Sequence, residues 1–388
     1  MRDSCMVNDS YVYVDRHDTY AALSAGEKDG VVVGERPGGT SEVRLISTPE
    51  APRTVAGAGY HLGSLTSPVH ETSTSFDTLL PSWNAKTPLG TWLGLEVRVR
   101  SGNVWTNWFD MGIWASGTES VERHSVKGQE SGSWRVSTDT VESIGPVFAD
   151  AYRYRLTLFT EEWGVSPEVR GVFITVSDSR RHGEDLSVPA DVGSRGWELE
   201  VPMRSQMVYP DGGEAWCSPV SLSMVMAYWA AKIGEDRLDQ PVPTVVRGTY
   251  DAVYKGTGNW SFNTAYACSF RLVASVNRFS SLGQAERWIV SEVPVIASIK
   301  WHNRDSEQQL TGAPLSSSNG HLLVVRGFDS SGDVIVNDPA GGDDSRVRRI
   351  YGRDEFSRAW FSGSGGVVYL VRPEGWSIPD GSCARGSW

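Results

Sequence analysis

A cysteine, a histidine and an aspartate follow one another in the second half of the chain, each in a setting that suits chemistry. Cys217 opens the stretch Cys-Ser-Pro, directly before a long apolar segment. A cysteine at the start of a helix is favoured as a thiolate by the helix dipole and the free N–H groups there. His321 begins the apolar run His-Leu-Leu-Val-Val, and Asp338 ends the next such run. These are the residue types of a nucleophile, its base and a group that orients the base.

The runs that carry His321 and Asp338 are predicted to form a β-hairpin, because the Asp-Ser-Ser-Gly between them has the composition of a turn. A four-residue loop would place Phe328 opposite Asp333 and Leu323 opposite Asp338. His321 would then be a diagonal neighbour of Asp338 on the same face, about 7–8 Å away between backbones, within reach of their side chains. The spacing therefore predicts an imidazole–carboxylate pair.

Other residues could stabilise or hold a substrate. Gln206 lies upstream in an expected loop, and its amide could donate to an oxyanion together with the N–H groups at the start of the Cys217 helix. Simple packing is the alternative role for the aromatic and loop residues in this set. The expected substrate contacts are Trp216, Asn259, Trp260, Asn319 and Gly320.

The region from residue 197 to 388 is predicted to be an α+β domain. Ser218–Lys232 is apolar around most of its circumference, which indicates a buried helix, with Gly234 suited to cap its C-terminus. A second, amphipathic helix is expected at Leu282–Val290. The expected strands are Pro294–Lys300, His321–Phe328, Asp333–Asn337 and Gly366–Val371. A helix followed by several strands is typical of the α+β class.

Residues 1–177 have a different pattern, which predicts an all-β sandwich. Leu93, Leu95, Val97 and Val99 alternate with polar residues, as in a half-buried strand. The expected strands are Tyr11–Val14, Gly30–Val33, Val43–Ile46, Trp92–Arg100, Tyr152–Phe159 and Gly171–Val176. Residues 1–47 are either an arm or extra strands, and the polar stretch 178–196 is the expected linker. The many tryptophans here fit core packing better than a binding module with stacking aromatics.

Several stretches also resemble a known family. Residues 200 to 372 are similar to C39-like peptidases of the papain superfamily, in particular stand-alone actinobacterial forms. The matching stretches are WCSPVSLSMVMAY from Trp216, GTGNWSFNTA from Gly256, NGHLLVVRGF from Asn319 and VNDPA from Val336. PSWN at 81–84 and TPLGTW at 87–92 resemble the β-domain that precedes the peptidase domain in those proteins.

The resemblance implies a papain-like fold, with Cys217 as nucleophile, His321 as base, Asp338 as third member and Gln206 at the oxyanion. The C39 domains fused to transporters cleave leader peptides after a double glycine. Because this chain lacks a phosphate-binding loop and an apolar segment long enough to span a bilayer, leader cleavage is not implied.

Composition narrows the choice of partners. The chain has 388 residues and a formal net charge of −11, which argues against a basic surface that binds nucleic acid. We expect no membrane span and no cofactor. We also expect no metal site, because the four cysteines are not spaced as metal ligands. No signal peptide is recognisable, so a cytoplasmic protein is expected unless a leader has been removed. Oligomeric state is not predicted.

Three functions fit these residues. The first is a cysteine-dependent hydrolase that cleaves an amide bond in a peptide or protein through a thioester acyl-enzyme. The second is a transpeptidase, acyltransferase or peptide-modifying enzyme that passes the same acyl group to an amine. The third is a non-catalytic binding protein, which the presence of all the polar site residues disfavours.

Overall fold

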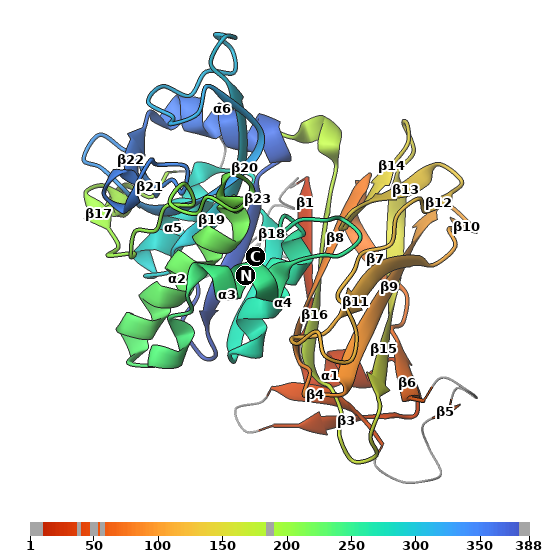
Figure 1. Cartoon of the computed structure of the whole chain (residues 1–388). Coiled ribbons are helices and arrows are strands. Elements are labelled where there is room, and N and C mark those ends of the chain that lie inside the picture. The colour runs from red at the N-terminus through yellow and green to blue at the C-terminus, as the bar shows by residue number, and fades with distance from the viewer. Residues whose placement is uncertain (1–10, 37–39, 47–52, 55–58, 184–189, 380–388) are drawn as a thin grey trace, which may run out of the picture. The chain divides into compact units, whose positions relative to one another are not determined.

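The computed structural model describes residues 11–36, 40–46, 53–54, 59–183 and 190–379 of the chain. Contacts divide the chain into two compact units, labelled by their elements in Figure 1. The first, here called the α+β unit, is built mainly from residues 179–249 and 270–388, and the second, the β unit, from 13–178 and 250–269. The multidomain α+β organisation expected from the sequence is therefore confirmed.

The β unit contains two eight-stranded sheets. The strands of the first are β1 (Val12–His17), β3 (Val31–Glu35), β4 (Ser41–Leu45), β8 (Thr78–Lys86), β12 (Glu130–Ser131), β13 (Trp134–Ser137), β14 (Thr140–Ser143) and β16 (Glu168–Ser177). Those of the second are β2 (Glu27–Asp29), β5 (Arg53–Thr54), β6 (His61–Thr66), β7 (His70–Phe76), β9 (Thr91–Ser101), β10 (Val104–Trp105), β11 (Phe109–Trp114) and β15 (Ala149–Thr160). The described part of residues 1–47 thus supplies strands to both sheets.

The order of the first sheet is β12-β13-β14-β8-β16-β4-β3, and β1 also pairs with β16. The order of the second is β10-β9-β15-β6-β2, and β11, β5 and β7 pair with β9, β6 and β15 respectively. A short helix, α1 (Tyr20–Ser24), follows β1. Two sheets in one unit agree with the sandwich type of architecture that the alternating strands predict.

The core of the β unit follows the predicted alternation. In the antiparallel β9–β15 ladder, Leu95 lies opposite Leu156 and Val97 opposite Tyr154, and all four are buried. On the other face of this ladder Arg155 binds Glu96 through two hydrogen bonds of 2.6 Å. Four of the tryptophans are also buried: Trp83, Trp92, Trp114 and Trp134. Their burial favours the packing role over stacking on a ligand.

Residues 250–269 belong to the β unit, although the sequence prediction placed them in the 197–388 domain. They contain α4 (Trp260–Ser269), which packs on β8. The hydroxyl of Ser261 donates to the carbonyl of Pro81 at 2.6 Å, and the Cys268 thiol lies 2.9 Å from Oδ1 of Asn84. Cys268 is fully buried, as an inert packing residue would be. Cys5 and Cys383 lie outside the described residues.

The α+β unit has one seven-stranded sheet and four α-helices among its described residues. The helices are α2 (Cys217–Ile233), α3 (Val242–Thr249), α5 (Leu282–Val290) and α6 (Arg353–Ser364). The strands are β17 (Trp197–Glu198), β18 (Leu272–Arg278), β19 (Val295–His302), β20 (Ser317–Phe328), β21 (Val334–Asn337), β22 (Arg348–Tyr351) and β23 (Val367–Pro373). The sheet order is β18-β23-β19-β20-β21-β22, with β17 paired to β20. The predicted helices and strands are all present, with ends that differ by a few residues.

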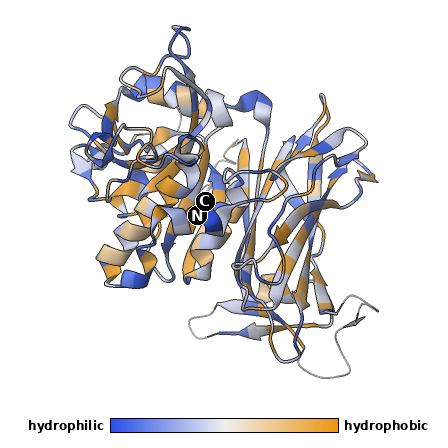
Figure 2. Cartoon of the chain, in the orientation of Figure 1, coloured by the Kyte–Doolittle hydropathy of each residue, from blue (hydrophilic) through white to orange (hydrophobic). Residues whose placement is uncertain are grey.

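The central helix α2 forms for the reasons that its sequence suggests. All of its residues from Ser218 to Ala230 are buried, so packing holds the helix along most of its length. Its hydrophobic residues are coloured orange in Figure 2. It contacts β20 and β23 of the sheet. Gly234 ends it in the left-handed conformation, with φ of 69°, and its N–H donates to the carbonyl of Ala230.

The β20–β21 hairpin corrects one detail of the prediction. Phe328 lies opposite Val334 and not Asp333, because the connection has one more residue than expected. A bulge at Arg326 then shifts the register back, so that Val324 lies opposite Asn337. This is the register that the sequence prediction required at the His321 end of the hairpin.

Among the described residues, no helix combines the length and the apolar character needed to cross a bilayer.

Candidate active site

Cys217 is the first residue of α2, and its side chain is half-buried. Backbone N–H groups of Ser218 and Leu322 donate to its sulfur. One of these donors belongs to the first turn of the helix and the other to β20. The sulfur therefore lies where the free N–H groups of a helix start and a strand backbone both favour negative charge.

His321 and Asp338 form a buried pair beside this cysteine. His321 lies on β20, Asp338 directly follows β21, and Nε2 of the imidazole is 2.8 Å from Oδ1 of the carboxylate. The side chains are only 3% and 0% exposed. The imidazole also hydrogen-bonds to Cys217. Because Nε2 faces the carboxylate, Nδ1 is the ring nitrogen available to the sulfur.

These contacts shift all three ionisation equilibria. Burial opposes charge on Cys217, but the hydrogen bond and charge of His321 outweigh it and lower the pKa of the thiol. Burial likewise opposes charge on His321, yet Asp338 and then Cys217 raise the pKa of the imidazole to about 10. The pKa of Asp338 is lowered, since the imidazolium outweighs the cost of burial. All three shifts favour the charged forms: a thiolate at Cys217, an imidazolium at His321 and a carboxylate at Asp338.

Asp338 is fixed by residues that the sequence analysis did not single out. The hydroxyl of Tyr351, on β22, donates to Oδ2 at 2.6 Å, and the N–H of Ala340 donates to Oδ1 at 2.9 Å. Tyr351 is fully buried, and burial followed by the charge of Asp338 raises the pKa of its hydroxyl, which keeps it a donor. Nothing in the spacing marks this tyrosine, because its position depends on how β22 pairs with β21.

Trp301 is a second neighbour that the sequence analysis did not assign to the site. Its ring meets the His321 ring edge-on, with centroids 5.4 Å apart and planes at 76°. Its indole N–H donates to the carbonyl of Leu315 at 3.1 Å, and the side chain is only 1% exposed. The indole therefore limits rotation of the imidazole away from its two partners.

Gln206 is anchored near both halves of the site. Its backbone N–H donates to the carbonyl of Pro339 at 2.8 Å, and its side-chain amide donates to the carbonyl of Glu214 at 2.9 Å. These partners directly follow Asp338 and closely precede Cys217 in the sequence. Gln206 is 1% exposed, and its Oε1 has no hydrogen-bond partner among the described residues. The amide has two N–H donors and Glu214 accepts from one of them, so the second remains available to a bound oxygen.

Three of the predicted substrate contacts adjoin the catalytic candidates in sequence. Trp216 precedes Cys217, is half-buried and packs against Tyr209 with ring centroids 5.6 Å apart. Asn319 and Gly320 precede His321 and are exposed at the start of β20. Their exposure leaves them accessible to a ligand.

Asn259 and Trp260 belong to the β unit. Asn259 is fully buried, and its amide donates to Asp251 at 3.0 Å. The backbone N–H of Trp260 donates to Asp139 at 2.5 Å. The polar contacts of Asn259 are made inside its own unit, which is the packing role that the sequence analysis left open.

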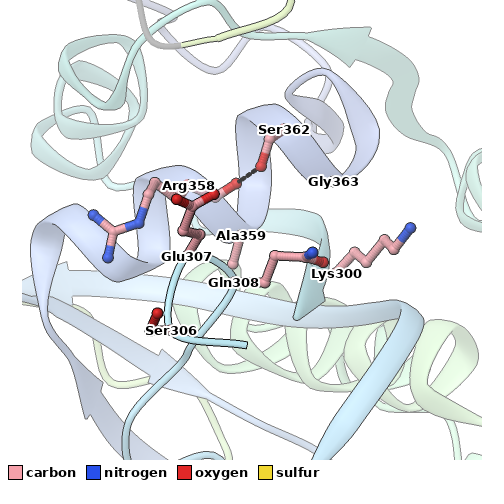
Figure 3. Close-up of a pocket in the computed structure, with 8 residues that line it drawn as sticks. All are labelled: Lys300, Ser306, Glu307, Gln308, Arg358, Ala359, Ser362 and Gly363. Carbon is pink, nitrogen blue, oxygen red and sulfur yellow. Dashed lines mark hydrogen bonds between the residues drawn. The ribbon is translucent and has the colours of Figure 1, made fainter. Parts of the chain in front are cut away.

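A cavity of about 750 Å³ on the α+β unit lies away from these residues. Figure 3 shows its lining, which includes Lys300 of β19, Glu307 of the following loop and Arg358 of α6. Neither Cys217 nor His321 lines it. The size of this cavity is therefore no guide to what Cys217 could attack.

Comparison with known families matches both parts of the chain. Residues 13–177 match the Peptidase C39 N-terminal domain, and residues 198–366 match the Peptidase C39 like family. No curated protein matches the chain.

Solved structures similar to parts of the chain include a protein assigned as a C39-like peptidase from Bacillus anthracis. It is 18% identical, with a TM-score of 0.31 over 45% of this chain and 97% of the other. A carbohydrate-binding module of a laminarinase from Zobellia galactanivorans is 10% identical, with a TM-score of 0.22 over 42% and 98%. A Clostridium thermocellum xylanase with its binding module is 13% identical, with a TM-score of 0.24 over 48% and 32%. At these values the likenesses indicate no shared ligand or substrate.

Proposed function

The chain belongs to the C39-like peptidases, and from this premise we propose that it is a cysteine-dependent hydrolase of amide bonds in peptides, with a papain-like catalytic fold. The observation that carries the proposal is the position of His321 between the Cys217 sulfur and the Asp338 carboxylate, 2.8 Å from the latter. This arrangement gives one imidazole both a nucleophile to activate and a carboxylate to stabilise its charge.

Acylation follows from the charges of the pair. The Cys217 thiolate attacks the carbonyl carbon of a peptide bond, and the electron pair of the carbonyl moves to its oxygen. The first N–H groups of α2 and the free N–H of Gln206 are the proposed donors to this oxyanion. As the C–N bond breaks, the His321 imidazolium gives its proton to the leaving amine, and a thioester remains on Cys217.

Deacylation uses the same residues in reverse. Neutral His321 takes a proton from water as the water oxygen attacks the thioester carbonyl. Collapse of the second tetrahedral intermediate releases the carboxylic acid product and restores the thiolate–imidazolium pair. An amine in place of water would make the enzyme an acyltransferase, and the residues described here would serve it equally.

Intact-mass measurement of the protein mixed with candidate peptides tests the proposal. We expect a transient mass increase equal to the acyl part of the peptide, present in the Cys268→Ala variant and absent in Cys217→Ala. Addition of an amine tests whether water or the amine accepts the acyl group from Cys217. A hydrolase yields mainly the free acid, and an acyltransferase yields mainly the amide. Peptide cleavage that persists in Cys217→Ala would contradict the proposed mechanism.

A further inference from the structure

Three side chains of metal-binding type meet in the β unit, in a place that the proposed function does not use. Asp15 and His17 are alternate residues of β1, so they point to the same side of the strand. His70 is the first residue of β7. β1 belongs to the first sheet and β7 to the second, so the cluster joins strands of both sheets. The sequence analysis expected no metal site because it considered only the spacing of the four cysteines.

The spacing of the three ligand atoms suits a tetrahedral ion. Oδ2 of Asp15 is 3.5 Å from Nε2 of His17 and 3.8 Å from Nδ1 of His70. One ligand atom from each residue lies within 4.8 Å of the others. Zinc–ligand bonds of about 2.0–2.1 Å in a tetrahedron put ligand atoms about 3.4 Å apart. The Asp15–His17 distance is close to this value, and the two distances to His70 would have to shorten when an ion binds.

His70 has no hydrogen bond to any described residue, although the ring is mostly buried. Its Nδ1 is too far from Asp15 for a hydrogen bond, and its Nε2 is buried without a partner. The ring is held by stacking, with centroids 5.1 Å from Tyr152 and 6.0 Å from Tyr154. A polar ring in this setting costs stability unless something binds it. A metal ion at Nδ1 would give the ring a polar partner on the side that faces Asp15.

Asp15 supplies a negative charge to the cluster. Arg153 carries a positive charge near the cluster. Its guanidinium donates to the Ser67 carbonyl at 2.8 Å and to Glu27 at 3.3 Å.

Tyr152 completes the surroundings of Asp15. Its hydroxyl donates to Oδ2 of Asp15 at 2.7 Å and is 2.9 Å from Nε2 of His17. Burial raises the pKa of this hydroxyl, so it remains a donor that orients the carboxylate. Hydrogen bonds of this kind to ligating carboxylates are usual around metal sites.

We propose that Asp15, His17 and His70 bind one divalent transition-metal ion of the zinc type. Two imidazoles and one carboxylate form a ligand set that zinc accepts, and Asp15 and His70 are 23% and 17% exposed, so a solvent molecule could supply a further ligand. For His17 to ligate through Nε2, its proton must move to Nδ1. The ion would link β1 to β7. The proposal is independent of the proposed function at Cys217.

Titration of the full chain with Co²⁺ and Zn²⁺ tests this site. The Cys217→Ser background removes the thiolate as a competing ligand. We expect one equivalent of Co²⁺ to give the visible absorption of a tetrahedral ion, and one equivalent of Zn²⁺ to displace it and raise the melting temperature. In the same background His70→Asn is expected to weaken binding by about 100-fold or more, since changes outside the ligand shell alone cost about 10–100-fold.

His124→Asn is the matched control, because His124 is another histidine of the β unit whose Nδ1 lies 2.8 Å from the Glu122 carbonyl. It should bind Co²⁺ like its parent. Folding of the metal-free His70→Asn variant is checked by circular dichroism, and histidine NMR signals of the parent report the ligands directly. Shifts of the His17 and His70 ring nitrogens on adding Zn²⁺ support the proposal. Absence of tetrahedral Co²⁺ absorption, or equal binding by the His70→Asn and His124→Asn variants, would overturn it.

Discussion

The two units each place histidine beside an aspartate that accepts a hydrogen bond from a tyrosine, yet the histidines differ in charge. In the α+β unit Asp338 accepts from Tyr351 and lies 2.8 Å from His321, whose pKa is raised to about 10. In the β unit Asp15 accepts from Tyr152 and lies 3.5 Å from His17, whose pKa is lowered. The same residue types thus favour the charged imidazole in one place and the neutral imidazole in the other.

The difference lies in what else contacts the imidazole. His321 is hydrogen-bonded to a fully buried carboxylate on one side and to an ionisable thiol on the other, so two partners support its charge. His17 shares a partly exposed carboxylate with a second histidine, and the rings lie 4.3 Å apart. For His17, burial therefore outweighs the opposing charges of Asp15 and Asp18. The first arrangement suits proton transfer, and the second suits a metal ion.

The largest expected effect is on turnover when His321 is removed. His321→Ala should reduce hydrolysis to near the background of Cys217→Ala, because neither the thiolate nor the proton for the leaving group is then provided. His70→Asn changes the other histidine group and should leave turnover within about twofold, because His70 takes no part in the proposed acylation. Peptide cleavage followed by mass spectrometry gives both values. Comparable losses of turnover in His321→Ala and His70→Asn would contradict the different roles assigned to the two histidine groups.

A smaller loss is expected when Gln206 is changed. Gln206→Ala should lower turnover by about 10²- to 10³-fold, the usual cost of one oxyanion donor. Alkylation of Cys217 by iodoacetamide should stay nearly unchanged, because that reaction forms no oxyanion. Equal loss of both activities would show that Gln206 only supports the structure around the cysteine.

A smaller effect again is expected at the carboxylate of the α+β unit. Asp338→Asn should retain more activity than Gln206→Ala, since an amide oxygen still accepts the imidazole N–H. Tyr351→Phe should cost about 1.5–3 kcal/mol in stability, the value for a hydrogen bond to a charged group, and less in turnover than Asp338→Asn. Urea unfolding and steady-state kinetics of both variants test this order. Wild-type turnover by Asp338→Asn would exclude the orienting role of Asp338.

The two groups should also respond in opposite senses to pH. The raised pKa of His321 stabilises the fold fully below about 6.5, its ordinary value in an unfolded chain, and this contribution is lost as pH rises through about 10. For His70 the unfolded chain takes up the proton first, so stability falls as pH drops from about 6.5 toward about 4.

Hydrogen exchange of β1 and β7 amides against β20 amides separates these effects, after correction for intrinsic exchange rates. Protection of β1 and β7 should weaken on the acid side, and His70→Asn should remove part of that change. Protection of β20 should weaken on the alkaline side, and His321→Ala should remove part of that change. The same pH profile in both regions would contradict the assigned charge states.

Much of the α+β unit was predictable from the sequence because its key features are local. The apolar character of residues 218–232 predicts α2, and the turn between two apolar runs predicts the hairpin that joins His321 to Asp338. Even there, the bulge at Arg326 was not foreseen, since its presence depends on how the five-residue connection closes. The predicted pairing of His321 with Asp338 is present because the bulge offsets the longer loop.

What the sequence did not reveal depends on contacts between distant segments. Residues 250–269 carry no sequence signal of the unit on which they pack, and the structure groups them with the β unit. Tyr351 and Trp301 reach the catalytic pair only through strand pairing. The cluster of His17 and His70 likewise exists only because two separate strands meet. Local sequence patterns predict individual helices and strands. Sites formed by distant segments can be recognised only when the pairing of the strands is known.

The most direct test of the central claim is the order in which the four cysteines react with substoichiometric iodoacetamide near pH 6, read by peptide mapping. A thiolate stabilised by His321 and the start of α2 should make Cys217 react first, well below the pH at which ordinary thiols ionise. His321→Ala should abolish this preference, and Cys268 should stay unlabelled until the protein unfolds. Labelling of Cys217 no faster than Cys5 or Cys383, or only after denaturation, would contradict its assignment as the nucleophile.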